Sequence, residues 1–173
     1  GILCARRDLI MAAALQHLDL DVYWDGWTPP PALIDKRRLK GAPQHGIGRS
    51  CKAGKEEIAG LLTALRLFVA EGDKARHARW LALLQTVQSG LGRTKGVVPS
   101  LSGAEDTAAV PSLHLSFQRE GRAAEVALLL QSQSPAIHVD AFLRERNILT
   151  VNPMCLTEAQ IGSLVRGLRK AVL

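Results

Sequence analysis

The residues best placed to do chemistry lie in one stretch, HGIGRSCKAGKEEIAGLLTAL, which runs from His45 to Leu65. A glycine-rich turn that carries Arg49, Lys52 and Lys55 leads directly into an amphipathic pattern typical of a helix. Glycines let backbone N–H groups approach a ligand closely, and a helix start presents unpaired donors and a partial positive charge. The pattern predicts a site for a phosphate or carboxylate, with Arg49, Lys52 and His45 as candidate ligands.

The same stretch also fits a solvated connection between two elements, because glycine often precedes a helix and cationic side chains there are usually hydrated. It differs from a nucleotide-binding P-loop, in which four residues separate the glycines and Ser or Thr follows the lysine. Here five residues separate Gly48 from Gly54, and Glu56 follows Lys55. An anion site and a plain connection therefore both stay open, whereas a P-loop is not favoured.

Composition favours a globular protein that does not enter a membrane. The 173 residues are 47% hydrophobic, which permits a sizeable core. We expect no membrane span, because no apolar run reaches the roughly 18 residues that cross a bilayer. Three cysteines without paired spacing indicate neither a disulfide framework nor a zinc site, so we expect a cytoplasmic location.

The net charge of +6 is compatible with nucleic-acid binding, but the basic residues are dispersed and aromatic residues make up only 4%. The alternative function is therefore a non-catalytic basic module that binds an anion or RNA through the Arg49 loop. The five histidines lack metal-binding spacing, and we expect surface or core roles for all except His45. No Gly-x-Ser-x-Gly motif indicates a hydrolase.

The sequence of residues 1–44 predicts few regular elements. Residues 1–5 are typical of a buried strand, and residues 6–16 of a short packed helix. Residues 19–44 contain four prolines, so we expect an irregular crossing with a turn or two of helix around residues 33–38.

The second part predicts helices with a small sheet. Helical spacing indicates two long helices, at about 51–71 and 73–89, which we expect to pair as neighbours. Alternating or β-branched residues and helical patterns then follow one another, which predicts strands at 112–117, 136–140 and 147–153 and a helix within 119–134. Closely spaced strands favour an antiparallel or mixed sheet with helices on one face.

The last helix has the clearest signals. Thr157 and Gln160 have the spacing of a capping box. The apolar residues that follow recur at helical spacing and should form its buried stripe: Ile161, Leu164, Val165, Leu168 and Val172.

The segment PQHGIGRSCKAGKEEIAGLLTAL closely resembles the pattern P-x-H-G-I-G-R-x-M-K-V-G-K-E-E-I of selenocysteine-synthase-like enzymes. These are pyridoxal-phosphate enzymes of the aspartate-aminotransferase fold, fold type I. The branch that the chain most resembles contains selenium transferases and D-glucosaminate-6-phosphate ammonia-lyases. The resemblance is strong around residues 41–65 and loose at 73–110. Cys51 and Ala53 replace an expected Met and Val, so both positions stay apolar.

The resemblance implies an α/β fold in two parts. Residues 1–48 would be a remnant of the large cofactor-binding domain, its last strand and helix, followed by the crossing segment. Residues 49–173 would comprise the long interdomain helix and a C-terminal small domain, in which helices cover a mainly antiparallel sheet. The complete protein would be a pyridoxal-phosphate-dependent lyase or transferase and a cytoplasmic homodimer or larger oligomer. It would catalyse β-elimination or replacement on a small anionic, amino-acid-like substrate, which can be phosphorylated.

In such enzymes the lysine that forms the Schiff base lies in a segment like S-G-G-K-x-x-x-G-P-Q, just before the residue that would align with Gly1. We therefore expect no catalytic residue within the chain, and no activity from the chain alone. Lys52 and Lys55 do not match that lysine, and the cofactor-binding residues stay unassigned. Arg49 matches an arginine that the resemblance places at the mouth of the active site, facing an anionic group. A guanidinium fork suits a carboxylate or phosphate there.

Overall fold

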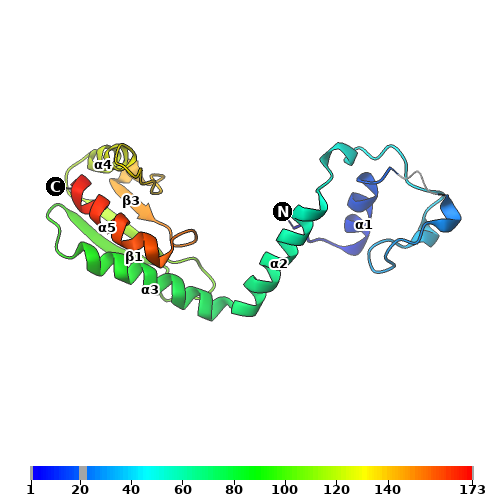
Figure 1. The fold of residues 1–173 in the computed structure, drawn as a ribbon, viewed down its shortest axis with the longest axis horizontal. Coiled ribbons are helices and arrows are strands. Elements are labelled where there is room, and N and C mark those ends of the chain that lie inside the picture. The colour runs from blue at the N-terminus through cyan, green and yellow to red at the C-terminus, as the bar shows by residue number, and fades with distance from the viewer. Residues whose placement is uncertain (1, 20–22, 173) are drawn as a thin grey trace. The chain divides into compact units, whose positions relative to one another are not determined.

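The computed structural model describes residues 2–19 and 23–172 (Figure 1). The chain divides into two compact units, Gly1–Ala64 and Leu65–Leu173. The boundary between them lies within helix α2, Lys55–Glu71.

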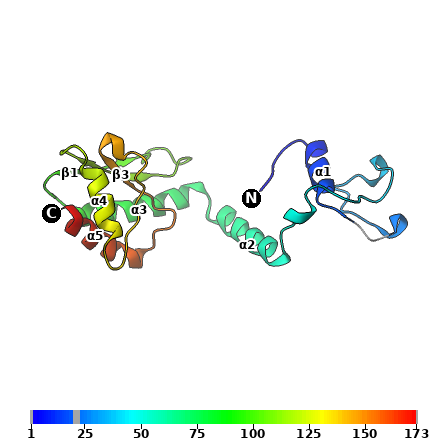
Figure 2. The same cartoon turned by 90° about the horizontal axis from the view of Figure 1, so that it is seen from above.

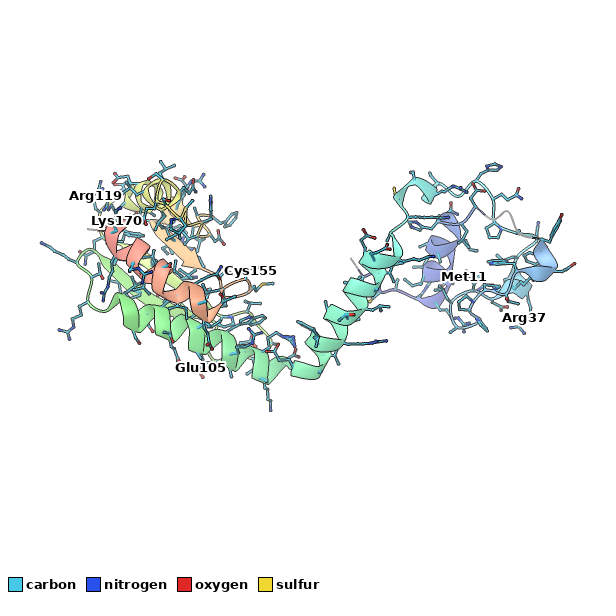
Figure 3. The ribbon with its side chains drawn as sticks, in the orientation of Figure 1. Met11, Arg37, Glu105, Arg119, Cys155 and Lys170 are labelled. Atoms are coloured by element: carbon cyan, nitrogen blue, oxygen red, sulfur yellow. The ribbon has the colours of Figure 1, made fainter. Side chains whose placement is uncertain are left out.

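The first unit contains helix α1, Arg7–Gln16, an irregular proline-rich segment, the 3₁₀ turn Arg49–Cys51 and residues 55–64 of α2. Met11 on α1 (Figure 3) and Ile34 are its buried apolar side chains among the described residues. The ammonium group of Lys36 donates to the carbonyl oxygens of Trp24 and Trp27, at 2.5 and 2.8 Å, and lies over the Trp24 ring. The prediction of an irregular crossing is confirmed, since its described residues form only single 3₁₀ turns at Trp24–Gly26 and Lys36–Arg38.

The predicted strand at the start of the chain is not formed. Residues 2–5 have no regular structure, and residue 1 lies outside the described residues. Ile2 and Leu3 are 57% and 68% exposed. A strand needs a neighbour for its backbone N–H and C=O groups, and the described part of this unit contains no strand that could pair with it.

Helix α2 begins at Lys55, four residues after the predicted start at Cys51. Residues Arg49–Cys51 instead form a 3₁₀ turn, and Lys52 is extended with φ −64° and ψ 133°. The N–H of Ile58 donates to the carbonyl oxygen of Gly54, at 3.2 Å. The start at residue 55 places Glu56 and Glu57 in the first turn, where the helix dipole favours negative charge.

In the second unit, an antiparallel sheet packs with three helices (Figures 1 and 2). The described strands follow the order β1-β2-β3, with bounds Val97–Ser102, Ser112–Phe117 and Ile148–Val151. The helices are α3, Asp73–Leu91; α4, Arg122–Gln131; and α5, Glu158–Val172. A 3₁₀ turn, Arg144–Arg146, precedes β3. The predicted architecture of an antiparallel sheet with helices is confirmed.

One hydrophobic core holds this unit together. Leu113, Leu115 and Phe117 alternate along β2 and are buried, while the residues between them are partly exposed. The helices supply the other side of the core, chiefly through Leu84, Val87, Val126, Leu130, Leu164 and Leu168. His77 is also buried, and its Nε2 lies 3.0 Å from the carbonyl oxygen of Gly103. This position agrees with the core or surface role expected for His77.

The predicted stripe of α5 faces the core. Leu164, Leu168 and Val172 are buried, and Ile161 and Val165 pack against the core while partly exposed. The helix start keeps one half of the expected capping box. The N–H of Thr157 donates to Oε1 of Gln160, at 2.9 Å.

Two parts of the sheet differ from the prediction. Strand β1 was not among the predicted strands. Pro99 lies within it, and proline cannot donate to a strand ladder. The proline is tolerated because β1 is at the edge of the sheet. The segment 136–140 was expected to be a full strand but forms an isolated bridge, in which Asp140 and Thr150 exchange two backbone hydrogen bonds.

The part of α2 in this unit, residues 65–71, does not pack alongside α3 as was expected. Gly72, with φ +72°, separates the two helices. The two helices contact each other close to this junction. The buried guanidinium of Arg76 lies 3.2 Å from the Phe68 ring centroid and donates to the Phe68 carbonyl oxygen. Arg79 also donates two hydrogen bonds to Glu71.

Stability of the second unit should depend on pH through Glu125. Arg119 (Figure 3) and Arg122 both donate to its carboxylate, which lowers the pKa of Glu125 from 4.5 to about 2. A carboxylate with a depressed pKa in the folded state stabilises the fold above its unfolded pKa, and this contribution is lost as the pH falls toward the folded value. The wild type should therefore have a higher melting temperature than Glu125→Gln at pH 6. The difference between the two melting temperatures should disappear as the pH falls from 4.5 to 2.

Melting curves followed by circular dichroism at low salt check this, because salt screens exposed ion pairs. Glu105→Gln is the matched control, since Glu105 makes no ion pair with the described residues (Figure 3). A difference between wild type and Glu125→Gln that stays constant from pH 6 to pH 2 would contradict the assignment.

Candidate functional site

The glycine loop, residues 45–51, docks on the C-terminal end of α1. The N–H of Gly48 donates to the carbonyl oxygen of Gln16, at 2.8 Å, and the N–H of Gly46 donates to that of Leu18, at 3.2 Å. Two of the amides that the sequence offered to an anion are therefore already bonded to backbone.

Close packing explains the glycines of this loop. A Cβ on Gly46 would lie 2.3 Å from the carbonyl oxygen of Gln16 and 2.6 Å from that of Leu18, distances that no real side chain tolerates. A Cβ on Gly48 would lie 3.1 Å from the His17 ring. The loop thus reaches its position because Gly46 lacks a side chain, whereas a Cβ on Gly48 would require only a small shift of its neighbours.

Arg49 lies within this loop and is paired with Asp19. Its Nη1 donates to the backbone carbonyl oxygen of Asp19, at 3.2 Å, and forms an ion pair with the Asp19 carboxylate. The Asp19 carboxylate also accepts from the backbone N–H of His45, at 3.4 Å. The Arg49 side chain is 50% exposed and that of Asp19 is 23% exposed. Within the described part of the chain, Nε and Nη2 of Arg49 make no hydrogen bond.

Two of the three candidate ligands contact the same residue, Asp19, although His45 does so through its backbone N–H. His45 is exposed and has φ +54°, and its backbone shares Asp19 with the guanidinium of Arg49. Lys52 is exposed on the extended segment between the 3₁₀ turn and α2. The roles of His45, Arg49 and Lys52 in binding an anion stay predictions.

Asp19 is the residue of this site that sequence reasoning missed. It lies 30 positions from Arg49, in an irregular segment, and no periodic pattern links the two. The sequence does contain an acidic residue just after α1 and an arginine in a glycine loop. These two residues suggest an ion pair only once the loop is known to dock at the end of that helix.

The start of α2 is a poor anion site, although the sequence pattern predicted that the helix start would help to bind an anion. Glu56 and Glu57 occupy the first turn and already place negative charge at the positive end of the helix dipole. An anion would therefore be bound through Arg49 rather than through the helix start.

The described residues do not fit a complete pyridoxal-phosphate site. That cofactor requires a lysine for its aldehyde, a partner for its ring nitrogen and donors for its phosphate. Lys52 and Lys55 are exposed, and two loop amides are bonded to α1. Among the candidate ligands, Arg49 has a guanidinium whose Nε and Nη2 make no hydrogen bond with the described residues. No cluster of His, Cys, Asp or Glu suited to a metal occurs among the described residues.

The second unit contains a separate groove of about 580 Å³ between residues 135–140, residues 151–156 and α5. Its walls are mostly apolar and include Cys155 (Figure 3). Its one carboxylate, that of Asp140, accepts from the N–H of Phe142, at 2.8 Å. The groove contains no basic side chain other than His138, so it does not match the predicted anion site.

Comparisons with known proteins indicate what the fold resembles. No protein-family model matches the sequence. The chain is 24% identical over 176 residues to a 5′-C-glycyluridine monooxygenase-decarboxylase from a Streptomyces species, covering 100% of this chain and 37% of that protein. The structure of this chain is similar to that of D-glucosaminate-6-phosphate ammonia-lyase, with a TM-score of 0.59 and 21% identity. This match covers 76% of the chain and 35% of the ammonia-lyase chain.

The fold is that of a part of this ammonia-lyase. The likeness confirms the predicted α/β fold class. The chain spans little more than a third of the length of either protein. In the described part of the chain, no helix is both long enough and apolar enough to cross a bilayer.

Proposed function

We propose that this chain is the C-terminal part of a pyridoxal-phosphate-dependent lyase or transferase of the selenocysteine-synthase-like group. The fold likeness to D-glucosaminate-6-phosphate ammonia-lyase carries the proposal. Sequence similarity along the whole chain to a second, much longer protein, a monooxygenase-decarboxylase, supports the view that the chain is part of a longer enzyme. In this proposal residues 1–48 end the large domain, and residues 49–173 form the interdomain helix and small domain. The cofactor lysine lies upstream of Gly1, so the chain alone has no activity.

The names of the two similar proteins point to one class of substrate. D-Glucosaminate 6-phosphate and 5′-C-glycyluridine are both α-amino acids with a hydroxyl group on the β-carbon and a sugar-like tail. One of them also carries a phosphate. We propose that the complete enzyme acts on an amino-acid-like compound of this type, by β-elimination or by replacement. The protein works as a cytoplasmic homodimer or larger oligomer.

Arg49 supplies the anion contact in this proposal. Its Nη1 donates to Asp19, while Nε and Nη2 make no hydrogen bond with the described residues and the side chain is 50% exposed. A guanidinium edge with two parallel N–H groups matches a carboxylate or phosphate in bidentate geometry. Arg49 therefore binds and orients the anionic end of the substrate, whereas pyridoxal phosphate supplies the electron sink.

Anion binding by Arg49 can be measured on the 173-residue chain with inorganic phosphate. Arg49→Ala should weaken phosphate binding by about tenfold or more, because charge-assisted guanidinium contacts are strong. Arg38→Ala is the matched control, since Arg38 is an exposed arginine in the same unit. Titration calorimetry or ³¹P NMR gives the dissociation constants. Equal phosphate affinity in the wild type and Arg49→Ala would contradict the assignment.

The alternative function predicts a different binding experiment. A basic module that binds RNA through the Arg49 loop should bind transfer RNA with an affinity that falls steeply with salt. Arg49→Ala should then reduce this binding as well. Absence of salt-dependent binding would leave the enzyme-part proposal as the better one.

A further inference from the structure

We propose that Asp19 is a positioning residue that fixes the guanidinium of Arg49 for anion binding; this inference rests on the proposed function. Asp19 makes three contacts with the glycine loop. Its backbone oxygen and its carboxylate both accept from Arg49, and its carboxylate also accepts from the N–H of His45. The residue therefore touches the first residue of the loop and the arginine that follows the glycines.

The backbone just before Asp19 also holds the glycine loop. The three residues before it end helix α1, and two of their carbonyl oxygens hold the loop amides of Gly46 and Gly48. The loop can approach so closely because residue 46 is glycine, since a Cβ there would lie 2.3 Å from a backbone oxygen. Hydrogen bonds from one segment, residues 16–19, thus fix the loop from residue 45 to residue 49. Asp19 extends this backbone docking to the side chain that faces solvent.

The geometry separates a positioning role from a charge effect. Asp19 contacts Nη1 alone in the described structure, so the Nε and Nη2 edge stays open for a second anion. The Asp19 side chain is 23% exposed and that of Arg49 is 50% exposed. The acid thus lies deeper and the guanidinium lies toward solvent. A carboxylate next to an anion site repels the anion through its charge, whereas fixing a flexible arginine reduces the entropy lost on binding. The two effects have opposite signs.

Two conservative variants distinguish these effects. Asp19→Asn removes the charge and keeps an acceptor oxygen, and Asp19→Glu keeps the charge but moves it by one methylene. Positioning predicts that both variants bind inorganic phosphate about tenfold more weakly than the wild type, as expected when contacting groups are uncoupled. A pure charge effect predicts tighter binding by Asp19→Asn and unchanged binding by Asp19→Glu. Asp25→Asn, at an exposed acid in the same unit, is the control and should bind like the wild type.

The test uses phosphate titrations of the 173-residue chain together with the ¹⁵N signal of Arg49 Nε, assigned by its loss in Arg49→Ala. In the wild type this signal should be separate from those of mobile arginines, and in Asp19→Asn it should move among them. Phosphate affinity in Asp19→Asn equal to or above that of the wild type would overturn the positioning role while leaving Arg49 as the anion contact. Unchanged affinity in Arg49→Ala would instead overturn the proposed anion contact itself, and the positioning role with it.

Discussion

Replacing Asn147 with alanine should lower the free energy of unfolding of the second unit by about 3 kcal/mol, because three hydrogen bonds are lost. The side-chain amide of Asn147 donates to the carbonyl oxygens of Phe117 and Arg119, at 2.7 and 2.6 Å. Its side-chain oxygen accepts from the N–H of Ala123, at 3.0 Å. This residue therefore joins the end of β2 to the first turn of α4, whose own N-cap, Gly121, has no side chain.

Companion variants separate the hydrogen bonds from the backbone conformation. Asn147 has φ +59°, a left-handed conformation that glycine adopts without strain. Asn147→Gly should therefore be less destabilising than Asn147→Ala by about 1 kcal/mol. Hydrogen exchange of the β2 amides reports the opening of this unit alone. A cost below about 1 kcal/mol for Asn147→Ala would show that the three bonds contribute little.

Replacing Gly46 with alanine should displace the glycine loop from α1. The new Cβ would lie 2.3 and 2.6 Å from two backbone oxygens, which cannot move as a flexible side chain can. We expect the first unit to lose about 2 kcal/mol of stability, as in other overpacked sites. The displaced loop should also free Arg49 from Asp19, so phosphate binding should weaken along with stability.

Gly41→Ala is the matched control for this substitution, since nothing lies within 4 Å of a Cβ at that position. Hydrogen exchange of the Gly48 amide, which bonds to Gln16, measures the docking of the loop directly. Faster exchange in Gly46→Ala but not in Gly41→Ala is the expected result. Wild-type exchange at Gly48 in both variants would show that the loop does not depend on the close approach.

Elements with a clear period could be predicted from the sequence. The alternation of β2 and the stripe of α5 each place apolar residues on a single buried face, so the sequence pattern is itself the packing pattern. The edge strand of the sheet and the boundaries of the elements were harder to predict from the sequence. Pro99 argues against a strand and is compatible only with an edge, and edge position is decided by the neighbouring strands.

The candidate site shows the same limit. The resemblance and the residue types indicated Arg49, since an arginine after a glycine turn suits an anion. The use of the glycine amides could not be inferred, because their acceptors belong to the end of α1, about 30 positions away. Asp19 is hidden for the same reason. Contacts between irregular segments leave no period in the sequence, so only the fold reveals them.

We propose that this chain is part of a pyridoxal-phosphate enzyme whose cofactor lysine lies upstream of Gly1. The most direct test of this proposal is to add pyridoxal phosphate, reduce with borohydride and map modified lysines by mass spectrometry. One sample is the 173-residue chain, and the other is the gene product lengthened upstream of Gly1. We expect one stoichiometrically modified lysine in the longer product, upstream of Gly1, and no stoichiometric modification in the shorter chain. Stoichiometric modification of Lys52 or Lys55 in the 173-residue chain would contradict this account.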